Sequence, residues 1–174
     1  MNDLSQTRRL LLTTSMKGGG GKSTLAALLL DVLRSEGVEV AAWDADMSIG
    51  SLAQMHGSRD ASGRLLQEQD PLWGVDLYNI RDNSRDELIN SLGHPCPLLL
   101  HDIAGGALGE MERLFDEERS IAEFMETLRD LDVQPVFLHL ITPDISTVAS
   151  VRTWLDLCDA LPAGSLSPSH IAVL

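Results

Sequence analysis

Apolar residues follow two patterns that alternate along the chain. Nearly continuous apolar runs lie at residues 10–14, 38–43, 97–102 and 133–141, with a less regular one at 73–80. Between these runs, apolar residues recur at spacings of three and four, which indicates amphipathic helices. A continuous apolar run is typical of a strand that is buried on both faces. The order of these segments predicts a doubly wound α/β fold, a mostly parallel sheet with helices on both faces.

Each expected helix lies between two expected strands. The first covers residues 24–34, ends before Gly37 and has four leucine or valine residues at helical spacing: Leu25, Leu28, Leu29 and Val32. Further helices are expected at residues 49–55, 85–92, 111–130 and 146–161. The apolar run 171–174 predicts one more strand, so we expect a single domain, residues 1–174, that is truncated at its C-terminus.

Composition narrows the classes of function. The chain has 13 basic and 26 acidic residues, a net charge of −13, and therefore no general attraction for nucleic acid. Direct DNA binding is disfavoured but not excluded, because a missing segment could carry a basic patch. Cys96 and Cys158 have neither metal-ligand nor disulfide-framework spacing, which favours a reducing cytoplasm. No apolar run approaches the roughly 20 residues of a membrane span.

The stretch SMKGGGGKSTLAALLL, residues 15–30, carries the clearest chemistry in the sequence. Consecutive glycines let backbone N–H groups turn toward a ligand without interference from side chains. The glycines follow an expected strand and precede an expected helix, whose N-terminus attracts anions. Two lysines, Lys17 and Lys22, flank them. The segment therefore predicts a phosphate-binding loop.

Residues 17–24 fit the pattern K-G-G-x-G-K-S/T at every fixed position. This resembles the deviant Walker A motif of the ParA/MinD family of ATPases, the branch that includes the arsenite-pump ATPase and the nitrogenase iron protein. Met16 stands where an ordinary phosphate loop has glycine, and Gly20 replaces the usual valine or alanine. The resemblance implies a SIMIBI-like P-loop NTPase fold, with ATP and Mg²⁺ as cofactors.

The loop residues have distinct expected roles. The amides of Gly18, Gly19, Gly20 and Gly21 face the phosphates, and Lys22 reaches the β and γ phosphates. The Ser23 hydroxyl ligates magnesium, while Thr24 donates to the α phosphate. By the resemblance, Lys17 crosses to the nucleotide of a second subunit, as an arginine finger does in trans. ATP would then join two copies of the chain.

Carboxylates follow two of the expected strands. Asp44 and Asp46 come after the run 38–43, at the edge where an open α/β sheet binds its ligand. The resemblance implies that Asp46 orients the attacking water and that Asp44 supports the magnesium shell. Asp102 ends another apolar run, as a Walker B carboxylate does, and would hold the metal through a water. Gly105 follows at D-x-x-G spacing, so its N–H is expected to sense the γ phosphate.

Other residues have weaker signals. Thr142, Pro143, Asp144 and Thr147 loosely match a family stretch that approaches the nucleotide or the dimer interface. The five histidines have no ligand spacing, so no zinc site is expected, and His101 is interpreted as a hydrogen-bonded sheet histidine, with tuning of the switch as the alternative. The tryptophans are interpreted as core or interface anchors: Trp43, Trp73 and Trp154.

The leading hypothesis is a cytoplasmic ATP hydrolase that dimerises on ATP and positions or partitions a plasmid, chromosome or large assembly. Such a switch needs a protein activator or cargo adaptor, which the sequence does not identify. One alternative is an ATP-dependent amide-forming synthetase of cobyrinate or dethiobiotin type, but Lys17 argues against it. The other is a nucleotide-gated scaffold with little hydrolysis, against which Asp46 argues.

Overall fold

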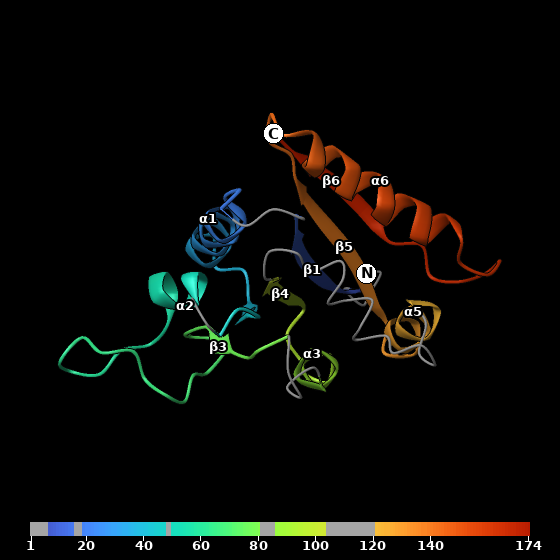
Figure 1. The fold of residues 1–174 in the computed structure, drawn as a ribbon. Coiled ribbons are helices and arrows are strands. Elements are labelled where there is room, and N and C mark those ends of the chain that lie inside the picture. The colour runs from blue at the N-terminus through green and yellow to red at the C-terminus, as the bar shows by residue number, and fades with distance from the viewer. Residues whose placement is uncertain (1–6, 16–18, 48–49, 81–85, 104–120) are drawn as a thin grey trace.

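The computed structural model describes residues 7–15, 19–47, 50–80, 86–103 and 121–174. Within these residues the strands form one six-stranded sheet in the order β3-β2-β4-β1-β5-β6, and every neighbouring pair is parallel (Figure 1). The strands are β1 (Arg8–Thr14), β2 (Val40–Asp44), β3 (Asp76–Leu77), β4 (Leu98–Asp102), β5 (Val133–Leu140) and β6 (Ser169–Val173). The described helices are α1 (Lys22–Ser35), α2 (Ser51–His56), α3 (Asp86–Ser91), α5 (Ile121–Asp130) and α6 (Ile145–Asp159).

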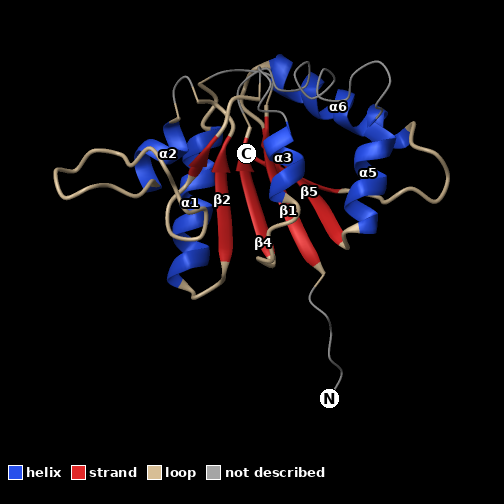
Figure 2. Cartoon of the chain, turned by 90° about the horizontal axis from the view of Figure 1, so that it is seen from below, coloured by secondary structure: helices blue, strands red, loops and turns tan. Residues whose placement is uncertain are grey.

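Two layers of core side chains cover the sheet, one on each face. On one face Leu10, Leu12 and Leu99 pack with residues of α3, α5 and α6. On the other face Ala42 and Leu100 pack with residues of α1 and α2. Alternate residues of a strand point to opposite faces, so each apolar run supplies both layers. The predicted doubly wound α/β fold is confirmed, and Figure 2 shows the helices that flank the strands.

The outward face of α1 carries large apolar side chains that would be expected on its buried face. The leucine and valine spacing correctly predicted a helix, yet Leu28 is 60% and Val32 is 58% exposed. The buried face is made of Ala26, Ala27 and Leu30 instead. Small side chains let a helix approach a sheet closely, and α1 lies directly against β1 and β4.

The expected strand at 73–80 was too long. Only the two residues of β3 pair along the edge of β2, and Asp46 and Asn79 form an isolated bridge beyond it. Trp73 lies in a turn whose amides donate to Asp70, and it is 78% exposed, so it is not a core residue. Trp43 and Trp154 are buried as predicted. Of the expected helix 111–130, α5 accounts for 121–130, and the earlier part lies outside the described residues.

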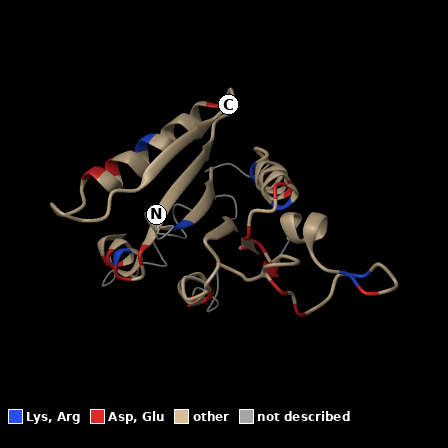
Figure 3. Ribbon diagram, turned by 180° about the vertical axis from the view of Figure 1, so that it is seen from behind, with Lys and Arg blue, Asp and Glu red and all other residues tan. Residues whose placement is uncertain are grey.

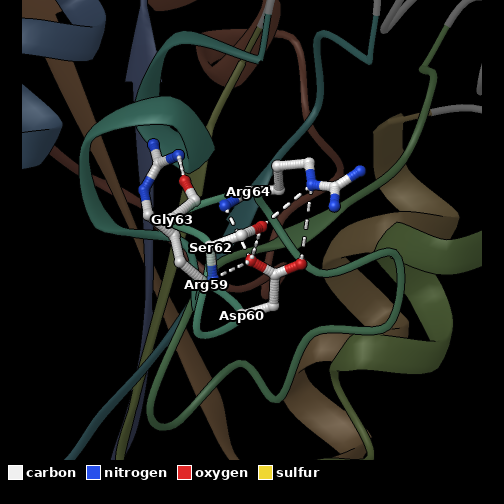
Figure 4. A network of polar contacts seen from close by, with 5 residues as sticks. All are labelled: Arg59, Asp60, Ser62, Gly63 and Arg64. Atoms are coloured by element: carbon white, nitrogen blue, oxygen red, sulfur yellow. Dashed lines mark hydrogen bonds and ion pairs between the residues drawn. The ribbon is translucent and has the colours of Figure 1, made fainter.

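A hairpin at residues 57–66 projects from the body of the molecule beyond α2 (Figure 1). Its tip is held by Asp60, whose carboxylate accepts hydrogen bonds from the amides of Ser62 (2.8 Å) and Arg64 (3.0 Å) (Figure 4). Arg59 donates to the Gly63 carbonyl oxygen at 3.0 Å and pairs with Leu65 in an antiparallel bridge. These short-range bonds order a segment that has no apolar periodicity.

Positions of both charge signs are spread over helices, strands and loops of the ribbon (Figure 3). Among the described residues, the Lys and Arg positions lie on several separate elements rather than in one stretch. In the same part of the chain, no helix has the length and apolar character needed to cross a membrane.

Candidate functional site

The predicted site residues that the structure describes gather at the carboxyl edge of the central strands. Thr13 of β1 and Asp44 of β2 both pair in register with Asp102 of β4. The phosphate loop connects the end of β1 to α1, so it enters the same edge. Open α/β sheets bind their ligands at this edge.

The described part of the loop has the backbone that the glycines predict. Gly19 and Gly21 have φ angles of 73° and 96°, in the left-handed region that side chains disfavour. Gly21 is the N-cap of α1, and no side chain caps this helix. The N-terminus of α1 therefore begins at this glycine loop, which is where a helix binds an anion. Lys17 and Gly18 lie outside the described residues.

Lys22 is buried at the first turn of α1, with only 6% of its surface exposed. Burial lowers the pKa of its ammonium group, while nearby Asp102 and Asp46 act in the opposite direction. A buried ammonium beside two carboxylates is an arrangement that a polyphosphate with a metal ion would complete.

Asp102 is held by two hydroxyl groups. Thr13 Oγ1 donates to Asp102 Oδ1 at 2.7 Å, and Ser23 also hydrogen-bonds to this carboxyl group. Burial raises the pKa of Asp102, and the bonds to Ser23 and Thr13 and the charge of Lys22 oppose that shift. The structure thus brings Ser23, Lys22 and Asp102 into one cluster, although they come from two separate elements.

Asp44 connects β2 to the start of α2. Its Oδ1 accepts from the Asp46 amide at 3.0 Å, and its Oδ2 accepts from the amides of Leu52 (2.8 Å) and Ala53 (3.1 Å). Burial is the largest influence on this carboxyl group and raises its pKa to about 6 despite these bonds. Asp44 therefore fixes the segment that carries Asp46.

The donor set fits a magnesium ion. Ser23 supplies a hydroxyl oxygen beside the Asp102 carboxylate, and Asp44 lies in register with Asp102. Magnesium prefers oxygen ligands and commonly combines one or two protein groups with phosphate oxygens and water. Within the described residues, no group of three or more His, Cys, Asp or Glu could hold a metal by itself. The expected ion would thus depend on bound phosphate.

The remaining predicted residues are less central. Thr24 is exposed on the first turn of α1, and Gly105 lies outside the described residues. Asp144 is the N-cap of α6 and accepts from the Ser146 amide at 2.9 Å. Thr147 accepts from the Thr142 amide at 3.1 Å, so this stretch, which includes Pro143, is held by local capping bonds. It follows β5, the strand beside β1, at the same edge.

One buried network under the site was not predicted in detail. His101 is fully buried, with Tyr78 Oη 3.0 Å from its Nδ1 and Ser91 Oγ 3.0 Å from its Nε2. Its ring stacks on Trp43, with centroids 4.8 Å apart. Burial lowers the pKa of His101 to about 3, so the imidazole is neutral. The interpretation of His101 as a hydrogen-bonded sheet histidine is confirmed, but its partners are distant in sequence.

A second histidine group lies between β5 and β6. His139 Nε2 is 2.8 Å from His170 Nδ1, and Thr14 Oγ1 is 2.9 Å from His139 Nδ1. Burial lowers the pKa of His139 to about 4, and the adjacent His170 acts in the same direction. Phe137 stacks on His170 and contacts Trp154. No short-range sequence pattern joins these residues.

The fold and this edge define an α/β protein of the P-loop NTPase class. Residues 6–96, more than half of the chain, match the ParA family model that is described as NUBPL iron-transfer P-loop NTPase. The chain therefore belongs to this family. Membership supports a nucleotide-dependent switch, nucleotide hydrolysis and the use of nucleotide with Mg²⁺ in general terms. No curated protein matches the sequence.

Solved structures match the chain at low sequence identity. The BceF tyrosine kinase domain is 14% identical, with a TM-score of 0.50 over 94% of this chain and 68% of that one. Chloroplast FtsY from Physcomitrella patens is 16% identical, with a TM-score of 0.49 over 86% and 46%. Signal recognition particle receptor FtsY from Elizabethkingia anophelis is 13% identical, with a TM-score of 0.46 over 87% and 47%. The chain spans about half the length of these FtsY proteins.

Proposed function

We propose that the protein is an ATP-dependent dimerising switch that hydrolyses ATP and positions a cargo. The observation that carries this proposal is the burial of Lys22 beside Asp102 and Asp46. Asp102 and Asp46 offset the burial that disfavours the charged ammonium, so Lys22 keeps a positive charge at the start of α1, where the triphosphate of ATP would bind. Family membership supports the class of activity, while ATP, the dimer and the cargo belong to the proposal.

The residues of the edge have complementary roles in this proposal. The loop amides of Gly18–Gly21 and Lys22 bind the phosphates, and Thr24 donates to the α phosphate. Ser23, Asp102 and Asp44 hold Mg²⁺, directly or through water. When bound, the ion neutralises charge on the β and γ phosphates. Hydrolysis here needs a positioned water more than covalent chemistry from the protein.

Asp46 is the residue we assign to that water. Its amide is fixed by Asp44 Oδ1, and its carboxylate lies close enough to act on the charge of Lys22. A carboxylate beside the Lys22 ammonium group, which we assign to the phosphates, is placed to accept a hydrogen bond from the attacking water. The N–H of Gly105 is assigned a hydrogen bond to the γ phosphate, so the loss of that phosphate would release the loop that carries Gly105.

Lys17 supplies the dimeric part of the proposal. In the sandwich that the family resemblance implies, it reaches the phosphates held by the second copy. The cycle takes place in the cytoplasm, and a protein activator or adaptor connects it to the cargo. The net charge of −13 makes a protein partner a better expectation than direct DNA binding.

The printed description of the family model also raises iron transfer, which the thiols of this chain do not favour. Cys96 is buried and Cys158 is half-buried. Burial raises the pKa of the Cys96 thiol and raises that of Cys158 to about 11, and the two cysteines lack metal-ligand spacing in the sequence. A nucleotide switch is therefore the better proposal for this chain.

Two variants test the proposal by light scattering coupled to size-exclusion chromatography with saturating ATP and Mg²⁺. Asp46→Ala should bind ATP but hydrolyse it slowly, so it should accumulate as a dimer. Lys22→Ala should remain monomeric, because it lacks the main phosphate cation. Monomeric Asp46→Ala with bound ATP would contradict the role of Asp46 in hydrolysis within a dimer, and retained ATP affinity in Lys22→Ala would contradict the phosphate site.

A further inference from the structure

The segment 44–46, which carries both switch aspartates, is bonded on two sides. On one side the Tyr78 amide donates to the Asp44 carbonyl oxygen at 3.0 Å, and the Ile80 amide donates to that of Ala45 at 3.2 Å. On the other side the Ala45 amide donates to the Asp102 carbonyl oxygen at 3.0 Å. The segment thus lies between the chain at 78–80 and the end of β4.

The side chains under this segment join the same two neighbours. Tyr78 belongs to the first neighbour and His101 precedes Asp102 in the second, and their side chains are 3.0 Å apart. Trp43, the residue before Asp44, stacks on the imidazole with ring planes only 8° apart. The Tyr78–His101 contact therefore crosses beneath β2 at the level of residues 44–46, which we call the switch segment.

The direction of these hydrogen bonds follows from Ser91. Its hydroxyl donates to the Leu88 carbonyl oxygen at 2.7 Å, so its oxygen is left to accept from His101 Nε2–H. A neutral imidazole with a proton on Nε2 has an acceptor at Nδ1, to which Tyr78 donates. Both partners of the ring are thereby satisfied, and one tautomer is fixed.

We propose that His101 is a positioning residue for the hydrolysis step: its bond to Tyr78 holds the segment that carries Asp44 and Asp46 in place against the strand end that carries Asp102. This inference rests on the proposed function of those aspartates. A hydrolytic site loses rate steeply when its groups shift by a fraction of an ångström to an ångström, whereas phosphate binding by the loop amides does not depend on this brace.

Two matched variants separate positioning from general stabilisation. Tyr78→Phe and Ser91→Ala each delete one hydroxyl that bonds to the same imidazole, but only Tyr78 is joined to the switch segment. We expect Tyr78→Phe to lower kcat for ATP about tenfold with KM within about twofold of wild type. Ser91→Ala should leave both constants within about twofold, because the Tyr78 hydroxyl can bond to Nδ1 in either tautomer, as donor or as acceptor.

A second readout needs no nucleotide. In the full-length protein without ligand, Tyr78→Phe should speed amide hydrogen exchange at Ala45 and Asp46 roughly fivefold, and Ser91→Ala should not. Equal effects of the two variants, or no effect of Tyr78→Phe, would overturn the inference. A wild-type protein that does not hydrolyse ATP would instead overturn the proposed function. The exchange comparison would still test whether the Tyr78–His101 bond holds residues 44–46 in place.

If Tyr78→Phe does not fold, a second pair decides the same point. His101→Gln keeps one acceptor and one donor at the end of its side chain, whereas His101→Leu has neither. Recovery of kcat and of slow exchange at residues 45 and 46 in the glutamine variant alone supports positioning. Equal behaviour of the two variants overturns it.

Discussion

Two buried polar clusters of this molecule follow opposite physical rules. The charged cluster consists of Lys22, Asp44, Asp46 and Asp102 at the ends of β2 and β4 and the start of α1. The imidazole cluster consists of Thr14, His139 and His170 across β1, β5 and β6. In the charged cluster, burial disfavours the charged forms of Lys22, Asp44 and Asp102. In the imidazole cluster, neutral side chains hydrogen-bond to one another.

That difference distinguishes a candidate ligand-binding site, the charged cluster, from a structural one, the imidazole cluster. Burial raises the pKa of Asp44 and Asp102 and lowers that of Lys22, so all three lose by being charged in the folded protein. Charge kept at such a cost is typical of sites that await an ionic ligand. The imidazole cluster gains by remaining neutral, with hydrogen bonds of 2.8 and 2.9 Å. It needs no ligand to complete it.

The largest expected effect comes from exchanging the ammonium of the charged cluster for an apolar group. Lys22→Met retains much of the length of the side chain but not the cation that we propose binds the β and γ phosphates. ATP affinity should fall by about 100-fold or more, measured by calorimetric titration with Mg²⁺. As the matched control in the imidazole cluster, His170→Gln should stay within about twofold. Equal losses of ATP affinity in both variants would contradict the claim that the charged cluster, and not the imidazole cluster, binds the nucleotide.

The pH dependence of stability should have opposite signs in the two clusters. His139 has a folded pKa of about 4 against an ordinary 6.5, so its contribution is present above pH 6.5 and is lost as pH falls through 4. Asp44 has a folded pKa of about 6 against 3.8, so its contribution is present below pH 3.8 and is lost as pH rises through 6. Each effect is on the order of 3 kcal/mol.

Urea unfolding of two variants from pH 4 to 7 separates these contributions. His139→Gln should make the free energy of unfolding rise less with pH than in the wild type, because the neutral-histidine contribution is gone. Asp44→Asn should make it rise more, because a buried carboxylate no longer ionises over that range. His101 and His170 shift in the same direction as His139 and remain in both variants. Parallel pH profiles for the two variants would contradict the opposite signs.

The smallest effect is expected for an ion pair that belongs to neither cluster. Arg152 Nε is 2.9 Å from Asp156 Oδ1 on α6, a shorter contact than many buried ones, but both side chains are largely exposed. Asp156→Ala should change the free energy of unfolding by no more than about 0.5 kcal/mol in the same urea assay. A loss near that of a buried group would show that contact distance, rather than burial, sets these energies.

The charged cluster was largely predictable from the sequence, and the imidazole cluster was not. The glycine loop, Lys22 and the aspartates lie at strand ends, and parallel strands bring those ends together whatever their separation in sequence. His139, by contrast, meets Thr14 and His170 only because β1, β5 and β6 pack in one particular register. Side-chain partners of that kind have no local pattern.

Errors at the sheet edge have a related cause. Apolar content at 73–80 predicted a strand, but turn bonds to Asp70 fix Trp73 outside the sheet and only two residues pair. On α1 the pattern identified the helix, whereas close packing selected alanines as its buried face. The roles of all the site residues remain predictions, and Lys17, Gly18 and Gly105 also lie outside the residues that the structure describes.

The central claim is that ATP bound at this edge joins two copies of the chain into the active form. The most direct measurement is the ATP hydrolysis rate per protomer over a wide range of protein concentration with saturating ATP and Mg²⁺. The rate should rise with concentration and then level off as the dimer fills. A rate per protomer that is constant from the lowest concentration, for a protein shown to be monomeric there, would contradict the claim.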